Sequence, residues 1–130
     1  MDQLSVTLER PLDEVEVAVR AALAAQGFGV LSEIDVAATL RDRLGIERAP
    51  LRILGACNPS LVSRALERSL DVALAIPCNV VLYGQGPGRT RVAAADPATL
   101  MPGEEFGEIV RDARVRLAAA LAALAAEFAR

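Results

Sequence analysis

The sequence predicts an α+β fold, in which one largely antiparallel sheet has its helices packed on one side. Three observations lead to this prediction. Strand-like stretches with a two-residue apolar period alternate with amphipathic helical stretches in the first half of the chain. Residues 80–94 form two strand-like stretches around a glycine-rich turn, and one long amphipathic helix follows. Because no linker interrupts the pattern, we expect residues 1–130 to form a single domain.

The first two elements are a strand and a helix. Residues 4–8 alternate apolar and polar side chains, as a half-buried strand does. Pro11 suits the first turn of a helix, and Gly27 favours the left-handed conformation in which many helices end. We therefore expect a helix between these residues, with one apolar face against the sheet.

A second strand and a short helix come next. Residues 28–34 predict a strand whose side chains alternate between two faces. We expect Phe28, Val30 and Ile34 on one face, and Leu31 and Glu33 on the other. Asp35 is a suitable N-cap and Gly45 a suitable end for the helix, and we expect its apolar stripe to be buried. That stripe consists of Val36, Leu40 and Leu44.

The middle of the chain supplies the remaining strands. Residues 51–56 predict a third strand, after which Asn58 and the following proline signal a helix that runs to about residue 70. A strand at about residues 80–83 and its partner at residues 89–94 flank the glycine-rich turn.

The last helix is the clearest element. Three glutamates near its start suit the positive end of the helix dipole. Apolar residues then recur at helical spacing: Phe106, Ile109, Val110, Ala113, Leu117, Leu121, Leu124 and Phe128. We interpret this stripe as core. A contact between two copies of the chain is the alternative, because the many alanines permit close approach.

Composition excludes several kinds of chemistry. The chain has no histidine, so Ser-His-Asp catalysis, Cys-His catalysis and imidazole metal sites cannot form within it. It has no lysine either, which excludes Schiff-base chemistry and a Walker phosphate loop. We predict no metal site, and no particular cofactor is indicated.

Charge and hydropathy limit the partners. The net charge is −3, most arginines have an acidic residue close by, and aromatic residues are few, so nucleic-acid binding is not expected. The N-terminus lacks a signal-peptide pattern. The longest apolar run, residues 117–126, has about half the roughly 20 residues needed to span a bilayer. We expect a cytoplasmic protein that does not enter membranes, with both cysteines reduced.

Two short stretches resemble each other and contain both cysteines. Each cysteine, Cys57 and Cys78, is followed directly by an asparagine and has a proline nearby. We expect the two stretches to meet in the fold and to line the site, if the protein has one.

The cysteines have two readings. Cys57 lies just before a helix start, where the helix dipole lowers a thiol pKa and favours a thiolate nucleophile. Cys78 has no such helix. The alternative is that both are small apolar residues of the core. A mutual disulfide or a shared metal is a minor alternative.

The two asparagines differ in the same way. Asn58 has a local task as a helix cap. Asn79 lies in an apolar stretch, where a polar side chain needs a partner, and it is the better candidate for a ligand contact.

Three acidic residues complete the candidate set. Asp35 and Asp96 suit helix or turn caps. Glu33 is a candidate general base or cation ligand if its sheet face is covered, and a solvated side chain if that face is open. A hard-metal site built from all three is conceivable, but their spacing matches no known metal loop.

Four stretches, in order along the chain, resemble the signatures of the family catalogued as domain of unknown function 302. They are Gly27-Phe28-Gly29-Val30-Leu31-Ser32-Glu33-Ile34-Asp35-Val36, Leu54-Gly55-Ala56-Cys57-Asn58-Pro59, Ile76-Pro77-Cys78-Asn79-Val80-Val81-Leu82-Tyr83 and Ala95-Asp96-Pro97. The resemblance implies the α+β fold called TT1751-like, often assembled as a homodimer. It implies no activity, because the family has none established.

Three functional hypotheses remain open. The first is a non-enzymatic domain that binds or senses a small ligand, with candidate contacts at Glu33, Asp35, Cys57, Asn58, Cys78, Asn79 and Asp96. The second is a thiol-dependent enzyme or redox protein that uses Cys57, assisted by Glu33 or Asp96. The third is a homodimer with a structural or interaction role.

Overall fold

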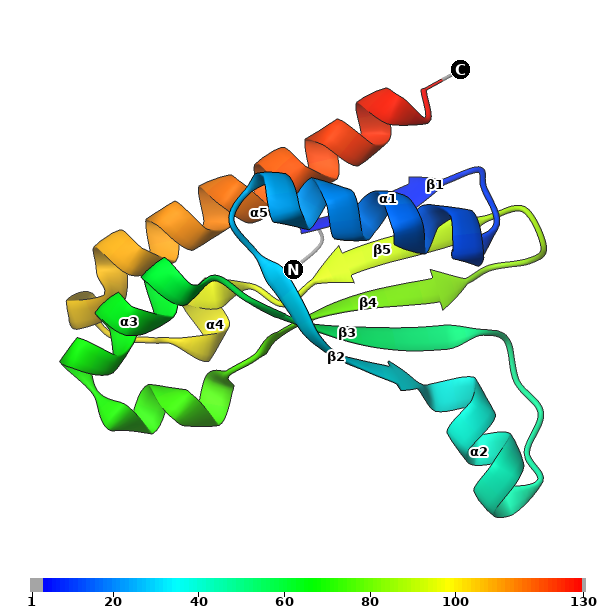
Figure 1. Cartoon of the computed structure of the whole chain (residues 1–130), viewed down its shortest axis with the longest axis horizontal. Coiled ribbons are helices and arrows are strands. Elements are labelled where there is room, and N and C mark those ends of the chain that lie inside the picture. The colour runs from blue at the N-terminus through cyan, green and yellow to red at the C-terminus, as the bar shows by residue number, and fades with distance from the viewer. Residues whose placement is uncertain (1–3, 130) are drawn as a thin grey trace.

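A computed structural model describes residues 4–129 of the chain. Residues 1–3, part of the N-terminus in which we expect no signal peptide, lie outside the described residues, as does residue 130. The fold is one five-stranded antiparallel sheet with helices on one side (Figure 1). This confirms the predicted α+β class.

The sheet has the strand order β1-β5-β4-β3-β2. Its strands are β1 (Ser5–Leu8), β2 (Gly29–Asp35), β3 (Leu51–Cys57), β4 (Cys78–Gly84) and β5 (Thr90–Ala94). Every neighbouring pair is antiparallel. The two strands of the predicted hairpin, β4 and β5, pair as expected around the glycine-rich turn.

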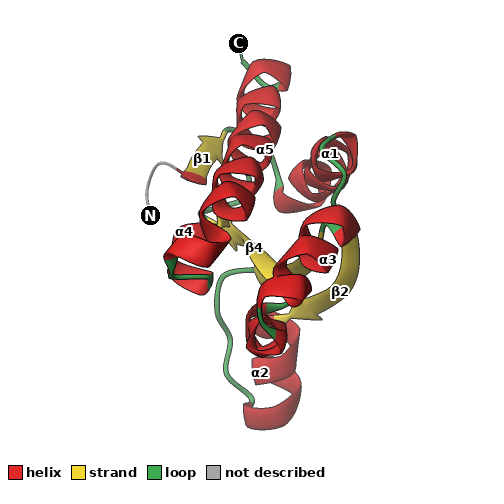
Figure 2. Ribbon diagram, turned by 90° about the vertical axis from the view of Figure 1, so that its left-hand side faces the viewer, coloured by secondary structure: helices red, strands yellow, loops and turns green. Residues whose placement is uncertain are grey.

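Two long helices, α1 (Leu12–Ala25) and α5 (Gly107–Glu127), pack side by side over the sheet (Figures 1 and 2). At one end of the sheet lie α3 (Pro59–Arg68), the 3₁₀ helix η2 (Leu70–Ala75) and α4 (Pro97–Leu100). The 3₁₀ helix η3 (Glu104–Phe106) leads into α5. At the opposite end, α2 (Val36–Leu44) stands apart from the other helices (Figures 1 and 2).

The core lies between the sheet and the helices α1 and α5. Leu54, Leu82 and Val92 are fully buried on the covered face, the sheet face against these helices. The apolar stripe of α5 supplies Leu117 and Leu124, which are 1% exposed. The prediction that this stripe is core is confirmed, and its leucines are therefore occupied within one copy of the chain.

A β-bulge in β2 overturns the predicted faces of that strand. The register shifts between Val30 and Ser32, so the extra residue reverses the alternation. Val30 opposes Ala56 and Glu33 opposes Leu54, both on the covered face, whereas Ile34 opposes Ile53 on the other face. The prediction that Ile34 shares a face with Val30, and Glu33 does not, is wrong.

The buried stripe predicted for α2 is also wrong. Asp35 caps the helix by accepting a hydrogen bond from the Ala38 N–H, and Gly45 ends it in the left-handed conformation, both as expected. However, no residue of the helix is buried, and Leu44 is 68% exposed. The helix extends beyond the sheet (Figure 1), and Val36 and Leu40 of its apolar stripe are only half-buried.

Candidate functional site

The two Cys-Asn stretches meet at the end of the sheet next to α3 and η2. Ala56 pairs with Cys78 and Gly55 with Asn79 across β3 and β4, which confirms the expected meeting. The chain leaves β3 directly into α3 and enters β4 from η2 through a cis Ile76–Pro77 bond. This end of the sheet therefore has a helical segment attached to each central strand.

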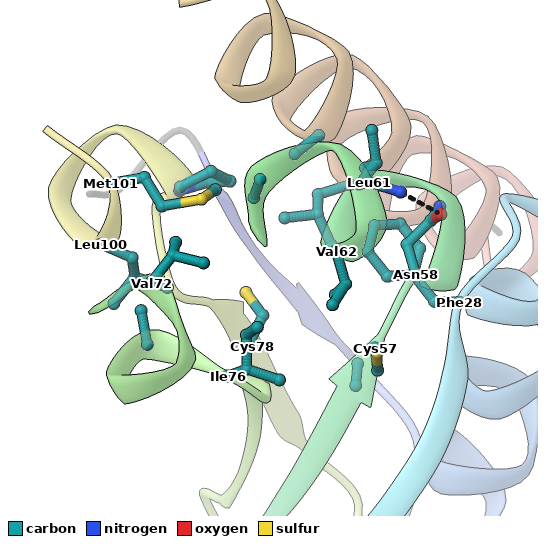
Figure 3. A pocket seen from close by; sticks show the side chains of 16 residues that line it. Phe28, Cys57, Asn58, Leu61, Val62, Val72, Ile76, Cys78, Leu100 and Met101 are labelled. Carbon is teal, nitrogen blue, oxygen red and sulfur yellow. Dashed lines mark hydrogen bonds between the residues drawn. The ribbon is translucent and has the colours of Figure 1, made fainter. Parts of the chain in front are cut away.

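These segments enclose an apolar cavity (Figure 3). Its cavity volume is about 60 Å³, and about 540 Å³ of space free of protein atoms is present when the open solvent at its mouth is included. The strand ends contribute Ala56, Cys57 and Cys78 to the lining. The helical walls contribute Leu61 and Ala65 of α3, Val72 of η2, Leu100 and Met101 at the end of α4, and Leu117 of α5.

All four signature stretches reach this cavity or lie beside it. Phe28 from the first stretch, Cys57 from the second, Cys78 from the third and Pro97 from the fourth all line it. Residues from distant parts of the sequence thus converge on one place, because the antiparallel strand order brings these strand ends together.

Both cysteines are free thiols. Burial raises the pKa of the Cys57 thiol, which is opposite in direction to the lowering expected from a helix start alone. Burial and the negative charge of Asp96 raise the pKa of Cys78 to about 11, and its thiol donates to the Ala95 carbonyl at 3.6 Å. Neither environment favours a thiolate at neutral pH.

Asn58 has the capping role predicted for it. Its Oδ1 accepts a hydrogen bond from the Leu61 N–H at 3.3 Å. Its Nδ2 donates to the Gln26 carbonyl at 3.2 Å, and Arg116 donates to the same carbonyl at 3.2 Å. The buried amide therefore holds the start of α3 against the end of α1, and both of its polar groups are engaged.

Asp96 caps α4, as predicted, by accepting from the Ala98 N–H at 2.9 Å. The side chain is 9% exposed and forms an ion pair with Arg114, with 3.4 Å between Oδ2 and Nη1. The fourth signature stretch therefore places a carboxylate that is paired with Arg114 close to the Cys78 thiol.

The other three candidates lie away from the cavity. Asn79 is exposed. Glu33 forms an ion pair with Arg20 of α1, and Asp35 caps α2 at the far end of β2. Glu33, Asp35 and Asp96 are thus not brought together. Across residues 4–129, no group of three or more histidine, cysteine, aspartate or glutamate side chains could hold a metal ion.

Sequence reasoning missed most of the cavity walls. Val72, Leu100 and Met101 are apolar residues in short irregular helices, and such residues look like ordinary core in a sequence. The one available signal is that Met101 comes shortly after the fourth signature stretch, which contains Asp96. The assembled site is an apolar cavity whose two thiols have raised pKa values.

Comparisons with known proteins agree with the fold. A family model described as "Domain of unknown function DUF302" matches residues 4–124. A crystal structure of an uncharacterized conserved DUF302 protein from Bacillus stearothermophilus is 31% identical in sequence. It superimposes with a TM-score of 0.81 over 91% of this chain and 94% of that one. No curated protein matches the chain.

No helix within residues 4–129 is long and apolar enough to cross a membrane.

Proposed function

The chain belongs to the DUF302 family, and we propose that it is a non-enzymatic domain that binds or senses a small ligand in the cavity. The observation that carries this proposal is the convergence of all four signature stretches on one apolar cavity. A concave, mostly apolar lining with few polar groups is typical of small-molecule sites.

Calorimetric titration tests this function without presupposing the ligand's charge. Three ligands share an eight-carbon chain and differ in the head group: 1-octanol, octanoate and octylammonium. We expect at least one to bind saturably with 1:1 stoichiometry. Ala65→Phe, which places a ring in the cavity from a residue that is 2% exposed, should weaken that binding at least tenfold.

The matched control is Ser63→Phe, on an exposed position of the same helix. It should bind like the wild type. Circular dichroism and urea unfolding establish that both variants fold. If no ligand binds, or if Ala65→Phe binds as well as Ser63→Phe, the cavity is not the site.

The thiol-dependent alternative has less support. Cys57 and Cys78 both line the cavity, but burial raises both thiol pKa values. Because the thiolate is the reactive form, these surroundings suit a protonated, inert cysteine. Two free thiols also accord with our proposal that the protein resides in the cytoplasm.

A homodimer is a second proposal, and the open face of the sheet favours it. We use "open face" for the side opposite the covered face. One row of residues crosses this face through successive strand pairs: Ser5, Ala93, Val81, Ile53 and Ile34. Four of these five residues are apolar, and Ile34 is 49% exposed.

The charges on this face permit a second copy to pack there. Arg91 is the charged strand residue beside the row, and its guanidinium lies 5.2 Å from the centre of the Tyr83 ring. Because each copy contributes one such charge from the strands of this face, like-charge repulsion between two copies is limited to this residue. This surface also replaces the leucine stripe of α5 as the expected contact, because Leu121 and Leu124 are buried in the core.

Sedimentation velocity of Val81→Arg tests the dimer. We expect the wild type to be dimeric and Val81→Arg to be a folded monomer. Val17→Arg is the control, because Val17 is 72% exposed on α1 and should leave the dimer intact. A monomeric wild type contradicts the proposal.

A further inference from the structure

The lining of the cavity carries no charge. Sixteen residues line it, and none of them is aspartate, glutamate, lysine or arginine. A ligand with a charged head group buried here would lose its hydration without gaining an ion pair, which is strongly unfavourable.

The polar groups in the lining are almost all engaged by the protein itself. The Asn58 amide caps α3 and binds the Gln26 carbonyl. The Cys78 thiol donates to the Ala95 carbonyl. The Cys57 thiol is left for a ligand, and a thiol is a weak hydrogen-bond donor. The lining can therefore satisfy at most a small polar group.

A buried carboxylate lies just outside the lining. Asp96 is 7% exposed, and its charge reaches Cys78, whose pKa it helps to raise. The cation beside it, Arg114, is already paired with it. A second carboxylate entering the cavity would meet the field of Asp96 and find no free cation on the lining.

We propose that the cavity takes a neutral aliphatic ligand, either a hydrocarbon chain or one ending in a single hydroxyl or carbonyl, and rejects carboxylates. This inference rests on the proposed function, because it names the ligand class of the same site. The walls supply apolar contacts to the ligand. A charged head group would find no partner, because Asn58, Cys78 and the Asp96–Arg114 pair are already bonded within the protein.

The same eight-carbon series tests the inference. At neutral pH, we expect 1-octanol to bind the wild type at least tenfold more tightly than octanoate. Octanoate affinity should rise as the pH falls towards the pKa of the ligand's carboxyl group, because the neutral acid is the form that enters. Affinity for 1-octanol should stay constant over that range.

Asp96→Asn sharpens the test. Asparagine keeps the cap on α4 but leaves Arg114 without its carboxylate. We expect octanoate to gain at least tenfold in affinity, with 1-octanol unchanged. Asp112→Asn is the control, because Asp112 is also paired with arginines, Arg64 and Arg116, but its charge, unlike that of Asp96, does not act on Cys78 of the lining.

The outcomes separate the two proposals. If octanoate binds as tightly as 1-octanol, the cavity remains the site but does not select against charge. The same conclusion follows if Asp96→Asn leaves the ratio of the two affinities unchanged. Binding of none of the three ligands overturns the proposed function, and the ligand class falls with it.

Discussion

The two faces of the sheet alternate residue by residue along β3 but differ in what surrounds them. Leu54 is fully buried under the helices, whereas its neighbour Ile53 is half-buried on the open face. Successive side chains of a strand point to opposite faces of the sheet, so these two neighbours lie on different faces, of which the helices cover one. The covered face therefore holds the buried core of the fold, while side chains of the open face stay partly accessible.

The two Cys-Asn stretches show the same division. Asn58 is buried beside the cavity with both polar groups bonded, whereas Asn79 is exposed. Similar sequence motifs therefore have different structural roles.

The largest effect is expected at Leu54. Leu54→Ala removes a fully buried side chain and leaves a cavity, so we expect a loss of about 3 kcal/mol. Ile53→Ala, one residue away on the open face, should cost less than about 1 kcal/mol in the monomer. Urea unfolding at low protein concentration measures both. Equal losses would contradict the division between the faces.

Asn58→Ala should have the next largest effect. It removes the cap of α3 and the bond to the Gln26 carbonyl, so we expect a loss of about 1–2 kcal/mol. Asn79→Ala should be within about 0.5 kcal/mol of the wild type, because the side chain is exposed. A larger loss for Asn79→Ala would show that the first asparagine is not the structural one.

The acid sensitivity of the covered face should be smaller and depend on Glu16. Burial by itself raises the pKa of Glu16, but hydrogen bonds with Glu33, Arg52 and Arg20 lower it overall from the ordinary value of 4.5. A lowered pKa stabilises the fold above the unfolded value, and this contribution is lost as the pH falls through the folded value.

Unfolding free energies measured from neutral pH down to about pH 3 should therefore fall less steeply for Glu16→Gln than for the wild type. The control is Glu14→Gln, since the Glu14 side chain is 53% exposed on the same helix. An acid limb that is identical in the wild type and Glu16→Gln would rule out this source of acid sensitivity.

Ionisation of Cys78 should not change the free energy of unfolding at neutral pH, and Cys78 should react slowly there. Because the folded pKa of Cys78 is raised to about 11, its contribution to the free energy of unfolding is constant below the ordinary pKa of 9.0. That contribution falls as the pH rises from 9.0 to the folded pKa. Iodoacetamide should alkylate Cys78 more slowly than it alkylates a fully solvent-exposed cysteine. Rapid alkylation of Cys78 or Cys57 near pH 7 would instead support the thiol-dependent function.

Local signals predicted much of this fold. The caps at Asp35, Asn58 and Asp96 follow from side chains that bond to backbone groups two or three residues away. The strands and the stripe of α5 follow from apolar periodicity. These features depend on neighbours in sequence, which is why sequence patterns contain them.

The predictions that were wrong, and the features that were missed, depend on contacts between residues far apart in the sequence. The bulge at Leu31 is set by the pairing of β2 with β3, and it moved Glu33 to the covered face. The exposure of α2 depends on the absence of a covering element, which its apolar stripe does not indicate. The cavity walls at Val72 and Met101 come from short helices whose placement depends on the packing around α3 and α4.

A neutral apolar ligand should bind in the cavity and not on the open face. The change in backbone amide ¹H–¹⁵N shifts on saturation with 1-octanol distinguishes the two places. We predict that the largest changes occur around the cavity, at Cys57, Leu61, Val72, Cys78 and Met101, with little change at Ile53 and Val81. Changes concentrated on Ile53 and Val81, or no saturable change at all, would contradict the claim.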